Sequence, residues 1–285
     1  MFRADLTLRF GPAASRGDGA ERNLRHPLNL LLLHPLSSFS KELALAQECA
    51  RAAAVVLREE FLRGSVVKSA VGKDIKLAAD VLAEECILGR LRAGSPHAIL
   101  SEEAGADAHL GETGLRWVVD PLDGTLNFSR RLPVCAISIG LCDGDQPVLG
   151  VIYDFLGDVL FSGGVGEGAT RNGIPMRVSE VTDPAAAVIC TGFPSGRSYD
   201  EAPLRAFVQK AQAYKKVRLL GSAAMSLAYV ASGSADVYHE DGINFWDVAA
   251  GLALVSAAGG TFQKRPTGKP WQMEVIATNG RLTPA

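Results

Sequence analysis

Cysteine and histidine are sparse in this chain of 285 residues, and neither forms a metal-binding pattern. The five cysteines are odd in number, lie mostly among apolar residues and show no C-x-x-C spacing, which argues against a disulfide framework and a thiolate metal site. The five histidines never pair at ligand spacing, which argues against zinc. A reduced, cytoplasmic compartment is therefore predicted. The residues concerned are Cys49, Cys86, Cys135, Cys142, Cys190, His26, His34, His97, His109 and His239.

The chain also lacks an excess of charge of either sign and a long hydrophobic run. Its formal net charge of −2 gives no electrostatic footprint for nucleic acid or for an anionic membrane, so neither partner is expected. The apolar stretch Leu30–Leu33 is far shorter than the roughly 20 residues of a membrane span. Residues 1–37 mix Arg, Gly and Pro without the order of regions found in a signal peptide. We interpret them as a flexible extension, or as translation from an upstream start codon.

The hydrophobic content of 47% is enough for a large buried core, in one domain or in two lobes. Apolar residues at helical spacing predict helices over Ser38–Phe61 and Leu77–Leu91. Beyond Asp120 the pattern predicts antiparallel strands, and Asn172-Gly173 is a strong hairpin signal. The predicted strands are Val134–Cys142, Val148–Tyr153 and Val159–Ser162.

After Pro184 strands and helices alternate, which favours a second lobe with a partly parallel sheet. We therefore predict an extension over 1–37, an α+β lobe with the metal site over 38–183, and an α/β lobe over 184–285. The elements expected in the last part are strands at Ala187–Thr191 and Val217–Leu219 and helices at Leu204–Ala213 and Ser222–Ala231.

Residues 120–125 read Asp-Pro-Leu-Asp-Gly-Thr and directly follow the apolar run Trp117–Val119. We predict that two carboxylates and a hydroxyl project from a tight turn at the end of a strand, where Gly124 lets a ligand approach the backbone. Mg²⁺ prefers such oxygen ligands and usually keeps waters and phosphate oxygens beside them. Taken alone, the motif has a plain alternative, because Asp and Gly also populate ordinary acidic turns.

Two further segments deliver acids in the same way. Upstream, a short apolar strand leads to the adjacent carboxylates Glu102 and Glu103. Downstream, Asp247 stands at the predicted start of a helix of small residues, where it can cap the helix and face a cation. Each segment is weak evidence alone, since acidic pairs are usually solvated and Asp is a common N-cap. Three apolar segments that each deliver an acid argue against a structural protein with an incidental acidic turn.

These segments resemble the signature of the inositol monophosphatase family of metal-dependent, lithium-sensitive phosphatases. The similarity begins near Phe39 and continues to about Gly280. It implies an α/β (α+β) fold, the layered αβαβα sandwich of the inositol monophosphatase and fructose-1,6-bisphosphatase type, with the site between two lobes. The residues that carry it are Glu102-Glu103, Asp120-Pro121-Leu122-Asp123-Gly124-Thr125 and Trp246-Asp247-Val248-Ala249-Ala250-Gly251, with the family-like Gly221-Ser222-Ala223-Ala224 and Tyr238-His239-Glu240.

The resemblance also implies a role for each site residue. Thr125 would orient the attacking water with support from Asp80, and Glu102 would join them in catalysis. The Mg²⁺ ligands would be Glu102, Asp120, Asp123, Asp247 and the backbone carbonyl of Leu122. The residues implied to contact the substrate are Leu122, Asp123, Gly124, Thr125, Gly221, Ser222, Ala223, Glu240 and Asp247.

Three of these assignments have structural alternatives. Asp80 could be a solvated helix residue, and the preceding Ile75-Lys76-Leu77 departs from the Pro-Val-Thr or Leu-Val-Thr type of sequence usual in the family. The segment Gly221–Ala223 could be a helix start packed closely on a neighbour, and Glu240 could be an acid in a surface loop.

The predicted function is Mg²⁺-dependent hydrolysis of a phosphate monoester, first of all inositol monophosphate or a related polyol or sugar phosphate, by a metal-activated water. The alternatives on the same fold are fructose-1,6-bisphosphatase, histidinol-phosphatase and 3′-phosphoadenosine nucleotide phosphatase activity. A non-catalytic regulatory binding protein is an alternative of another class, although every implied ligand position is filled. A homodimer is implied by the resemblance alone.

Overall fold

The computed structural model describes residues 39–64, 66–71, 74–111, 113–193 and 200–284, all within one compact unit that begins at Ser38. The predicted extension lies outside the described residues, and the division into lobes at 183/184 stays a prediction. In chain order the elements are α1 (Ser40–Arg63), β1 (Val67–Val71), β2 (Asp74–Leu77), α2 (Ala78–Gly94), β3 (Ala98–Ser101), β4 (Gly105–Ala106), β5 (Leu115–Asp123), α3 (Thr125–Ser129), β6 (Ala136–Asp143), β7 (Gln146–Asp154), β8 (Val159–Gly164), β9 (Gly168–Arg171), β10 (Ile174–Pro175), a 3-10 turn (Pro184–Ala186), β11 (Val188–Thr191), α4 (Glu201–Gln212), β12 (Lys216–Leu219), α5 (Ala223–Ala231), β13 (Val237–Asn244), α6 (Phe245–Ala257), β14 (Thr261–Pro266) and β15 (Gln272–Thr278).

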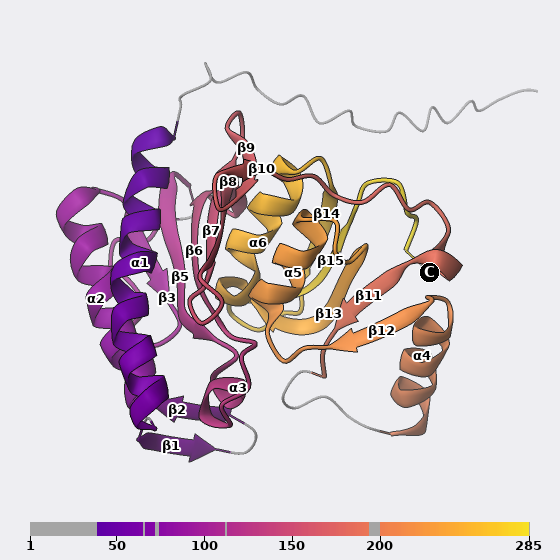
Figure 1. The fold of residues 1–285 in the computed structure, drawn as a ribbon, viewed down its shortest axis with the longest axis horizontal. Helices are drawn as coiled ribbons and strands as arrows, with labels where there is room; N and C mark the ends of the chain where they lie inside the picture. Colours follow the sequence, from indigo (N-terminus) through magenta and orange to yellow (C-terminus); the bar gives the residue numbers. More distant parts are fainter. Residues whose placement is uncertain (1–38, 65, 72–73, 112, 194–199, 285) are drawn as a thin grey trace, which may run out of the picture. The chain divides into compact units, whose positions relative to one another are not determined.

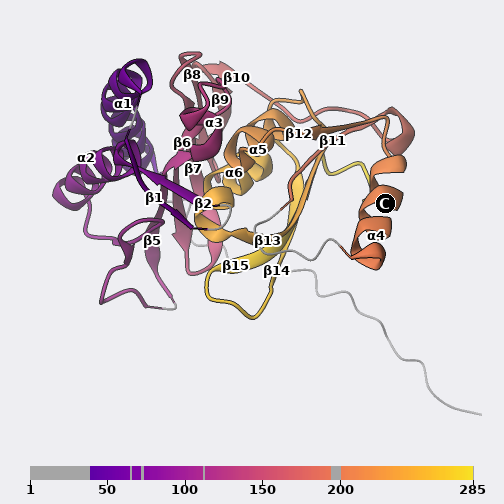
Figure 2. The same cartoon turned by 90° about the horizontal axis from the view of Figure 1, so that it is seen from below.

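The described residues are arranged in alternating helical and sheet layers (Figure 1). Helices α1 and α2 cover one face of an eight-stranded sheet, and α5 and α6 lie between that sheet and a five-stranded sheet. Helix α4 lies on the far side of the second sheet, as the view from below also shows (Figure 2). This arrangement confirms the predicted αβαβα sandwich.

The eight-stranded sheet has the order β10-β9-β8-β7-β6-β5-β3-β4. Strands β5 to β9 pair with their sequence neighbours in antiparallel fashion, as predicted, while β3 and β5 are parallel. The predicted hairpin joins β9 to β10 through Asn172 and Gly173, which have φ angles of 50° and 78°. Such positive φ angles at two central residues are the reason that Asn-Gly favours a tight hairpin.

The five-stranded sheet has the order β12-β11-β13-β15-β14. Strand β11 pairs in parallel with both β12 and β13, whereas β13, β15 and β14 are antiparallel to one another. The partly parallel sheet predicted after Pro184 is therefore confirmed. Because β11 and β13 are parallel and Thr191 pairs with His239, Gly192 immediately after the carboxyl end of β11 lies beside Glu240 in the middle of β13.

Helix α6 packs unusually close to the first sheet because two strands carry glycine at the contact. A Cβ atom built on Gly150 of β7 would lie 2.0 Å from the carbonyl oxygen of Ala250, and one on Gly140 of β6 would lie 3.0 Å from the Ala250 nitrogen. No side chain fits at either position without movement of backbone. The glycines therefore allow α6 to lie close to the first sheet.

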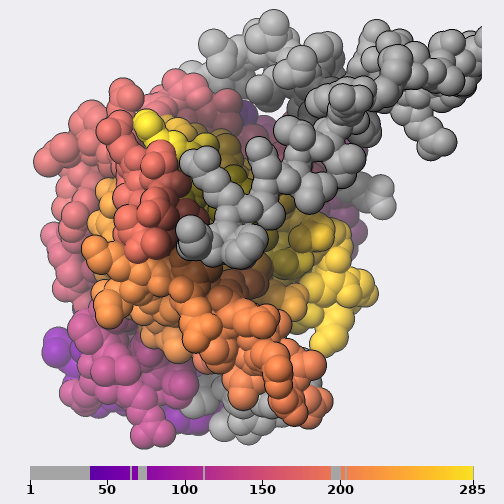
Figure 3. All heavy atoms as spheres, turned by 90° about the vertical axis from the view of Figure 1, so that its right-hand side faces the viewer, coloured from indigo at the N-terminus to yellow at the C-terminus, as the bar shows by residue number. Residues whose placement is uncertain are grey.

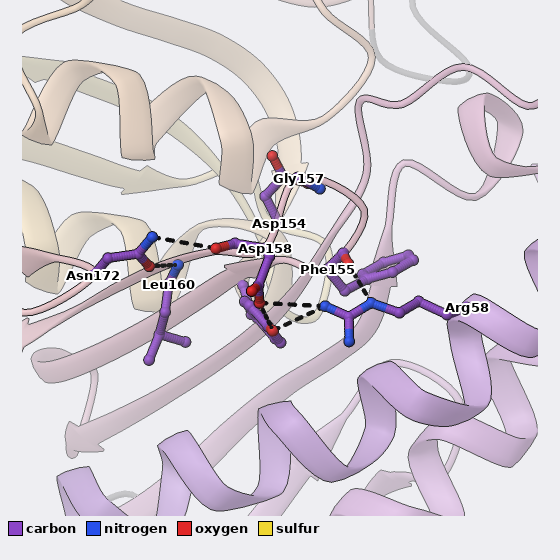
Figure 4. Close-up of polar contacts among 8 residues, drawn as sticks. Arg58, Asp154, Phe155, Gly157, Asp158, Leu160 and Asn172 are labelled. Carbon is purple, nitrogen blue, oxygen red and sulfur yellow. Dashed lines mark hydrogen bonds and ion pairs between the residues drawn. The ribbon is translucent and has the colours of Figure 1, made fainter.

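The opposite face of the first sheet is tied to α1 by Arg58 (Figure 4). Its Nε donates to the carbonyl oxygen of Phe155 at 2.6 Å, and its guanidinium donates to the hydroxyl of Tyr153 at 3.0 Å. Asp158 forms an ion pair with the same guanidinium at 3.4 Å, and Asn172 donates to the Asp158 carbonyl. These bonds join α1 to the β7–β8 connection and to the β9–β10 hairpin.

Helix α4 forms part of the surface at the edge of the second sheet, where it is seen in orange in Figure 3. Its outward residues include Leu204 and Val208, whose side chains are exposed. Lys210 on its other side lies 2.9 Å from Nδ1 of His239 in β13. Within the described residues no helix is both long and apolar enough to cross a membrane.

Candidate active site

The eleven residues predicted to bind metal or substrate come from segments far apart in the sequence, yet all of them line one cleft of about 760 Å³. The cleft is open to solvent and has walls from both sides of residue 183. Asp80 does not line it, although it lies behind Thr125. The predicted residues that line the cleft are Glu102, Asp120, Leu122, Asp123, Gly124, Thr125, Gly221, Ser222, Ala223, Glu240 and Asp247.

Strand pairing brings the first two acids together. Strands β3 and β5 are parallel, and Ser101 stands opposite Val119, so the next residues of the two strands, Glu102 and Asp120, emerge at the same edge. The Glu102 amide also donates to the carbonyl oxygen of Val119 at 3.1 Å. Parallel pairing at this point is the physical reason that two distant sequence motifs meet.

The predicted turn after Val119 is placed differently in the structure. Strand β5 continues to Asp123, which pairs with Ala136 of β6, and the ladder is irregular between Asp120 and Asp123. The chain turns only at Gly124, whose φ of 87° suits glycine alone. The irregular ladder lets both carboxylates face the cleft although they lie three residues apart.

Helix α6 delivers the fourth acid. Its N-cap is Asn244, and the amide of that residue donates to Oδ2 of Asp247 at 3.1 Å, which forms a capping box. Asp247 therefore stands in the first helical turn rather than at the N-cap itself. Its position follows from the close packing of α6 on β6 and β7.

Asp120 and Asp123 are buried, whereas Glu102 and Asp247 keep part of their surface exposed, yet all four acids are hard to ionise. The pKa of Glu102 is raised to about 7 and that of Asp123 to about 6, in both cases chiefly because burial disfavours the charged form. Burial and repulsion from Glu102 raise the pKa of Asp120 and of Asp247 well above the usual range. The four carboxyl groups thus offer oxygen ligands, and a bound cation would favour their ionised forms.

Backbone amides and one hydroxyl donate to three of these carboxylates, including Asp247, which accepts from the Asn244 amide. Asp123 accepts from the Ser222 hydroxyl at 2.5 Å and from the Ala224 amide at 2.7 Å, and Asp120 accepts from the Leu122 amide at 2.9 Å. Across the ranges that the structure describes, no three His, Cys, Asp or Glu side chains are gathered closely enough to hold a metal ion. The acids share one cleft but are not arranged as a preformed metal cage.

Asp80 and Thr125 form a second feature of the site. Asp80 belongs to the first turn of α2 and is 2% exposed, so the alternative of a solvated helix acid is wrong. Its Oδ2 accepts from the Leu77 amide at 2.5 Å, and burial raises its pKa to about 6 while the Thr125 hydroxyl lowers it. The Thr125 hydroxyl also donates to the carbonyl oxygen of Leu122 at 3.0 Å.

Sequence reasoning missed several residues of the cleft. Lys76 of β2 forms an ion pair with Glu103, and Gly192 and Phe193 follow β11 into the wall. Tyr238 is part of a family-like segment but was assigned no role; it does not line the cleft, but its hydroxyl donates to Glu240 at 3.0 Å. The sequence could have indicated Tyr238, because residues two apart on a strand share a face. Gly192 carried no comparable signal.

Comparison with known proteins identifies the family of the chain. The profile of the inositol monophosphatase family matches residues 39–283. The Nus factor SuhB of Salmonella typhimurium is 34% identical over 260 residues, which cover 89% of this chain and 94% of the relative. The inositol-1-monophosphatase of Synechocystis sp. is 38% identical over 221 residues, 73% of this chain and 74% of that protein.

The fold is shared with solved structures as well. The inositol monophosphatase from Anabaena (Nostoc) sp. superimposes with a TM-score of 0.75 at 36% identity, covering 85% of this chain and 92% of that one. The resemblance seen in the acidic motifs is therefore confirmed, and it supports phosphatase activity. On its sequence, its layered fold and the acids that meet in its cleft, this chain belongs to the inositol monophosphatase family.

Proposed function

We propose that the chain is a Mg²⁺-dependent phosphomonoesterase that hydrolyses inositol monophosphate or a related polyol or sugar phosphate. The observation that carries this proposal is the meeting of Glu102, Asp120, Asp123 and Asp247 in one cleft with the backbone of Leu122. A phosphate dianion repels an attacking water, so a site for its hydrolysis needs positive charge at the phosphate. Four carboxylates, of which Asp120 and Asp123 are buried, suit the binding of the cations that supply this charge.

The donor set fits a hard divalent cation. Carboxylate and carbonyl oxygens are the ligands that Mg²⁺ takes, and a cation would favour the ionised forms that burial now disfavours. Asp123 and Asp247 accept from the N–H groups of Ala224 and Asn244 through Oδ2, and each carboxylate has further lone pairs to offer a cation. When bound, Mg²⁺ neutralises phosphate charge, lowers the pKa of a water and stabilises the leaving alkoxide.

Thr125 and Asp80 would handle the attacking water. The Thr125 hydroxyl can turn its proton from the Leu122 carbonyl to the buried Asp80 carboxylate, and its oxygen can then accept a hydrogen bond from the water. The water oxygen bonds to phosphorus as the phosphorus–oxygen bond to the leaving group breaks. The water proton is taken up at the Thr125–Asp80 pair.

Other residues of the cleft would hold the substrate. The backbone amides of Gly124 and Thr125 are at the turn after β5, where they can donate to phosphate oxygens. The small residues Gly221 and Ala223 leave room for a ring, and Glu240 can accept hydrogen bonds from its hydroxyl groups.

Phosphate release from a panel of phosphomonoesters, with Mg²⁺ and with a chelator, tests the proposal. Hydrolysis should require Mg²⁺ and should fall by at least about a hundredfold in Thr125→Ala, the lower range for loss of general acid–base assistance. Asp143→Asn, which changes an exposed acid outside the cleft, is the matched control and should retain activity. Metal-independent hydrolysis, or normal turnover by Thr125→Ala, would count against the assignment.

Family membership also suggests a homodimer in the cytoplasm, which sedimentation of the purified chain would test. A binding role is the second candidate, because the Salmonella relative is named as a Nus factor. The two are separable in Asp120→Asn. A role that depends only on binding would survive this change, whereas hydrolysis would not.

A further inference from the structure

The register of two parallel strands determines which residue lies beside the Glu240 carboxylate. Strands β11 and β13 run in parallel with Thr191 opposite His239, so the next residues along, Gly192 and Glu240, lie side by side. The Thr191 hydroxyl donates to the carbonyl oxygen of His239 at 2.6 Å and secures this register. Gly192 and Glu240 both line the cleft.

Gly192 provides the space that this carboxylate fills. A Cβ atom built on Gly192 would lie 2.5 Å from Oε1 and 2.6 Å from Oε2 of Glu240, closer than real Cβ contacts. A side chain at position 192 would therefore displace the carboxylate. The three nearest atoms all belong to the end of the flexible Glu240 side chain, so this contact can be relieved without movement of the strands.

Tyr238 fixes the orientation of the same carboxylate. It lies two residues before Glu240 on β13, so both side chains are on one face of the strand. Its ring is 1% exposed, and its hydroxyl donates to Oε2 of Glu240 at 3.0 Å. Burial and the charge of Glu240 raise the pKa of Tyr238 well above 10, which keeps the phenol a neutral hydrogen-bond donor.

We propose that Gly192 and Tyr238 are positioning residues that hold Glu240 as a hydroxyl acceptor and thereby set a preference for phosphate esters of polyols over esters without hydroxyl groups. This inference rests on the proposed function. Gly192 leaves space for the carboxylate, and Tyr238 fixes the orientation from which the carboxylate oxygens accept hydrogen bonds from substrate. Neither residue touches the reacting phosphate.

The test compares kcat and KM for myo-inositol 1-phosphate with those for p-nitrophenyl phosphate, which has no hydroxyl group. Tyr238→Phe and Gly192→Ala should each lower the preference for the inositol ester roughly tenfold, mainly through its KM. Tyr214→Phe, a buried tyrosine outside the cleft, is the matched control and should keep the preference. In a Glu240→Ala background both changes should lose their effect, because the group that they position is gone.

Equal losses on both esters would overturn the inference, as would effects of Tyr238→Phe or Gly192→Ala that persist in Glu240→Ala. A Glu240→Ala variant that keeps the full preference would overturn it too. These outcomes differ from failure of the proposed function, in which the wild type would hydrolyse neither ester with Mg²⁺. Melting temperatures of all variants identify any loss of fold.

Discussion

The close packing of helix α6 against the first sheet should not tolerate a methyl group at position 150. The new Cβ would lie 2.0 Å from the carbonyl oxygen, 2.8 Å from the carbonyl carbon and 3.0 Å from the Cα of Ala250. All three are backbone atoms of a buried helix, so no side-chain rotation can relieve the contact. Gly150→Ala must therefore move α6 away from β7 or distort the strand.

The expected cost is about 3 kcal/mol or more of unfolding free energy, the upper part of the range for overpacked cores, because the obstacle is backbone. In a chain of this size such a loss lowers the melting temperature by about 6 to 12 °C. Thermal and urea unfolding, read by circular dichroism, measure the change. Since α6 also carries Asp247, Mg²⁺-dependent phosphate release should fall in the same variant.

Gly89→Ala is the matched control. Gly89 lies on the exposed side of α2, and a Cβ atom there meets nothing within 4 Å. The change should raise stability by about 0.5 to 1 kcal/mol, because alanine favours the helix. A Gly150→Ala protein that melts within about 2 °C of the wild type would refute the reasoning, since this corresponds to less than ~1 kcal/mol.

Three other predictions concern the site, the extension and pH. Asp120→Asn keeps the shape of a carboxylate but removes its charge, so Mg²⁺-dependent phosphate release should fall by orders of magnitude while the melting temperature is retained; normal turnover at saturating Mg²⁺ would contradict this. Removal of residues 1–36 should leave activity and melting temperature nearly unchanged, because the segment has few apolar residues; a large drop in either would show that it docks. Burial and Lys210 lower the pKa of His239, so at this site the unfolded chain binds more protons, and the histidine should contribute a loss of stability as the pH falls below about 6.5, against the opposite contribution of the acids whose pKa values are raised. Urea unfolding at pH 7.5 and 5.5 should show a change in stability on acidification that is more favourable in His239→Gln than in the wild type, and an equal change in both proteins would exclude this histidine as a cause.

Periodicity and turn chemistry predicted most of the elements, because each depends on neighbours in the sequence. The helix expected over Ser38–Phe61 is α1, and the hairpin expected at Asn172-Gly173 joins β9 to β10. The strand that ends at Asp123 was expected to end near Val119. Its extension depends on pairing with Ala136 in β6, which no local pattern records.

The acids of the site could be named from their motifs, but their partners could not. Asp123 is held by Ser222 and by the Ala224 amide, about a hundred residues away, and both contacts exist only once α5 has packed against the first sheet. The sequence suggested that these small residues make room for a substrate ring. The structure adds that the start of α5 holds one of the proposed metal ligands.

This arrangement links the stability of the fold to the chemistry of the site. Asp123 accepts from the first turn of α5, and Asp247 accepts from the N-cap of α6, so both central helices have a carboxylate of the cleft at their N-terminal ends. N-terminal N–H groups favour a negative charge, which partly offsets the burial that raises these pKa values. A cation that draws either carboxylate away must outweigh these bonds. If the cleft binds a cation as proposed, its affinity would depend on how α5 and α6 are capped as well as on the ligands themselves.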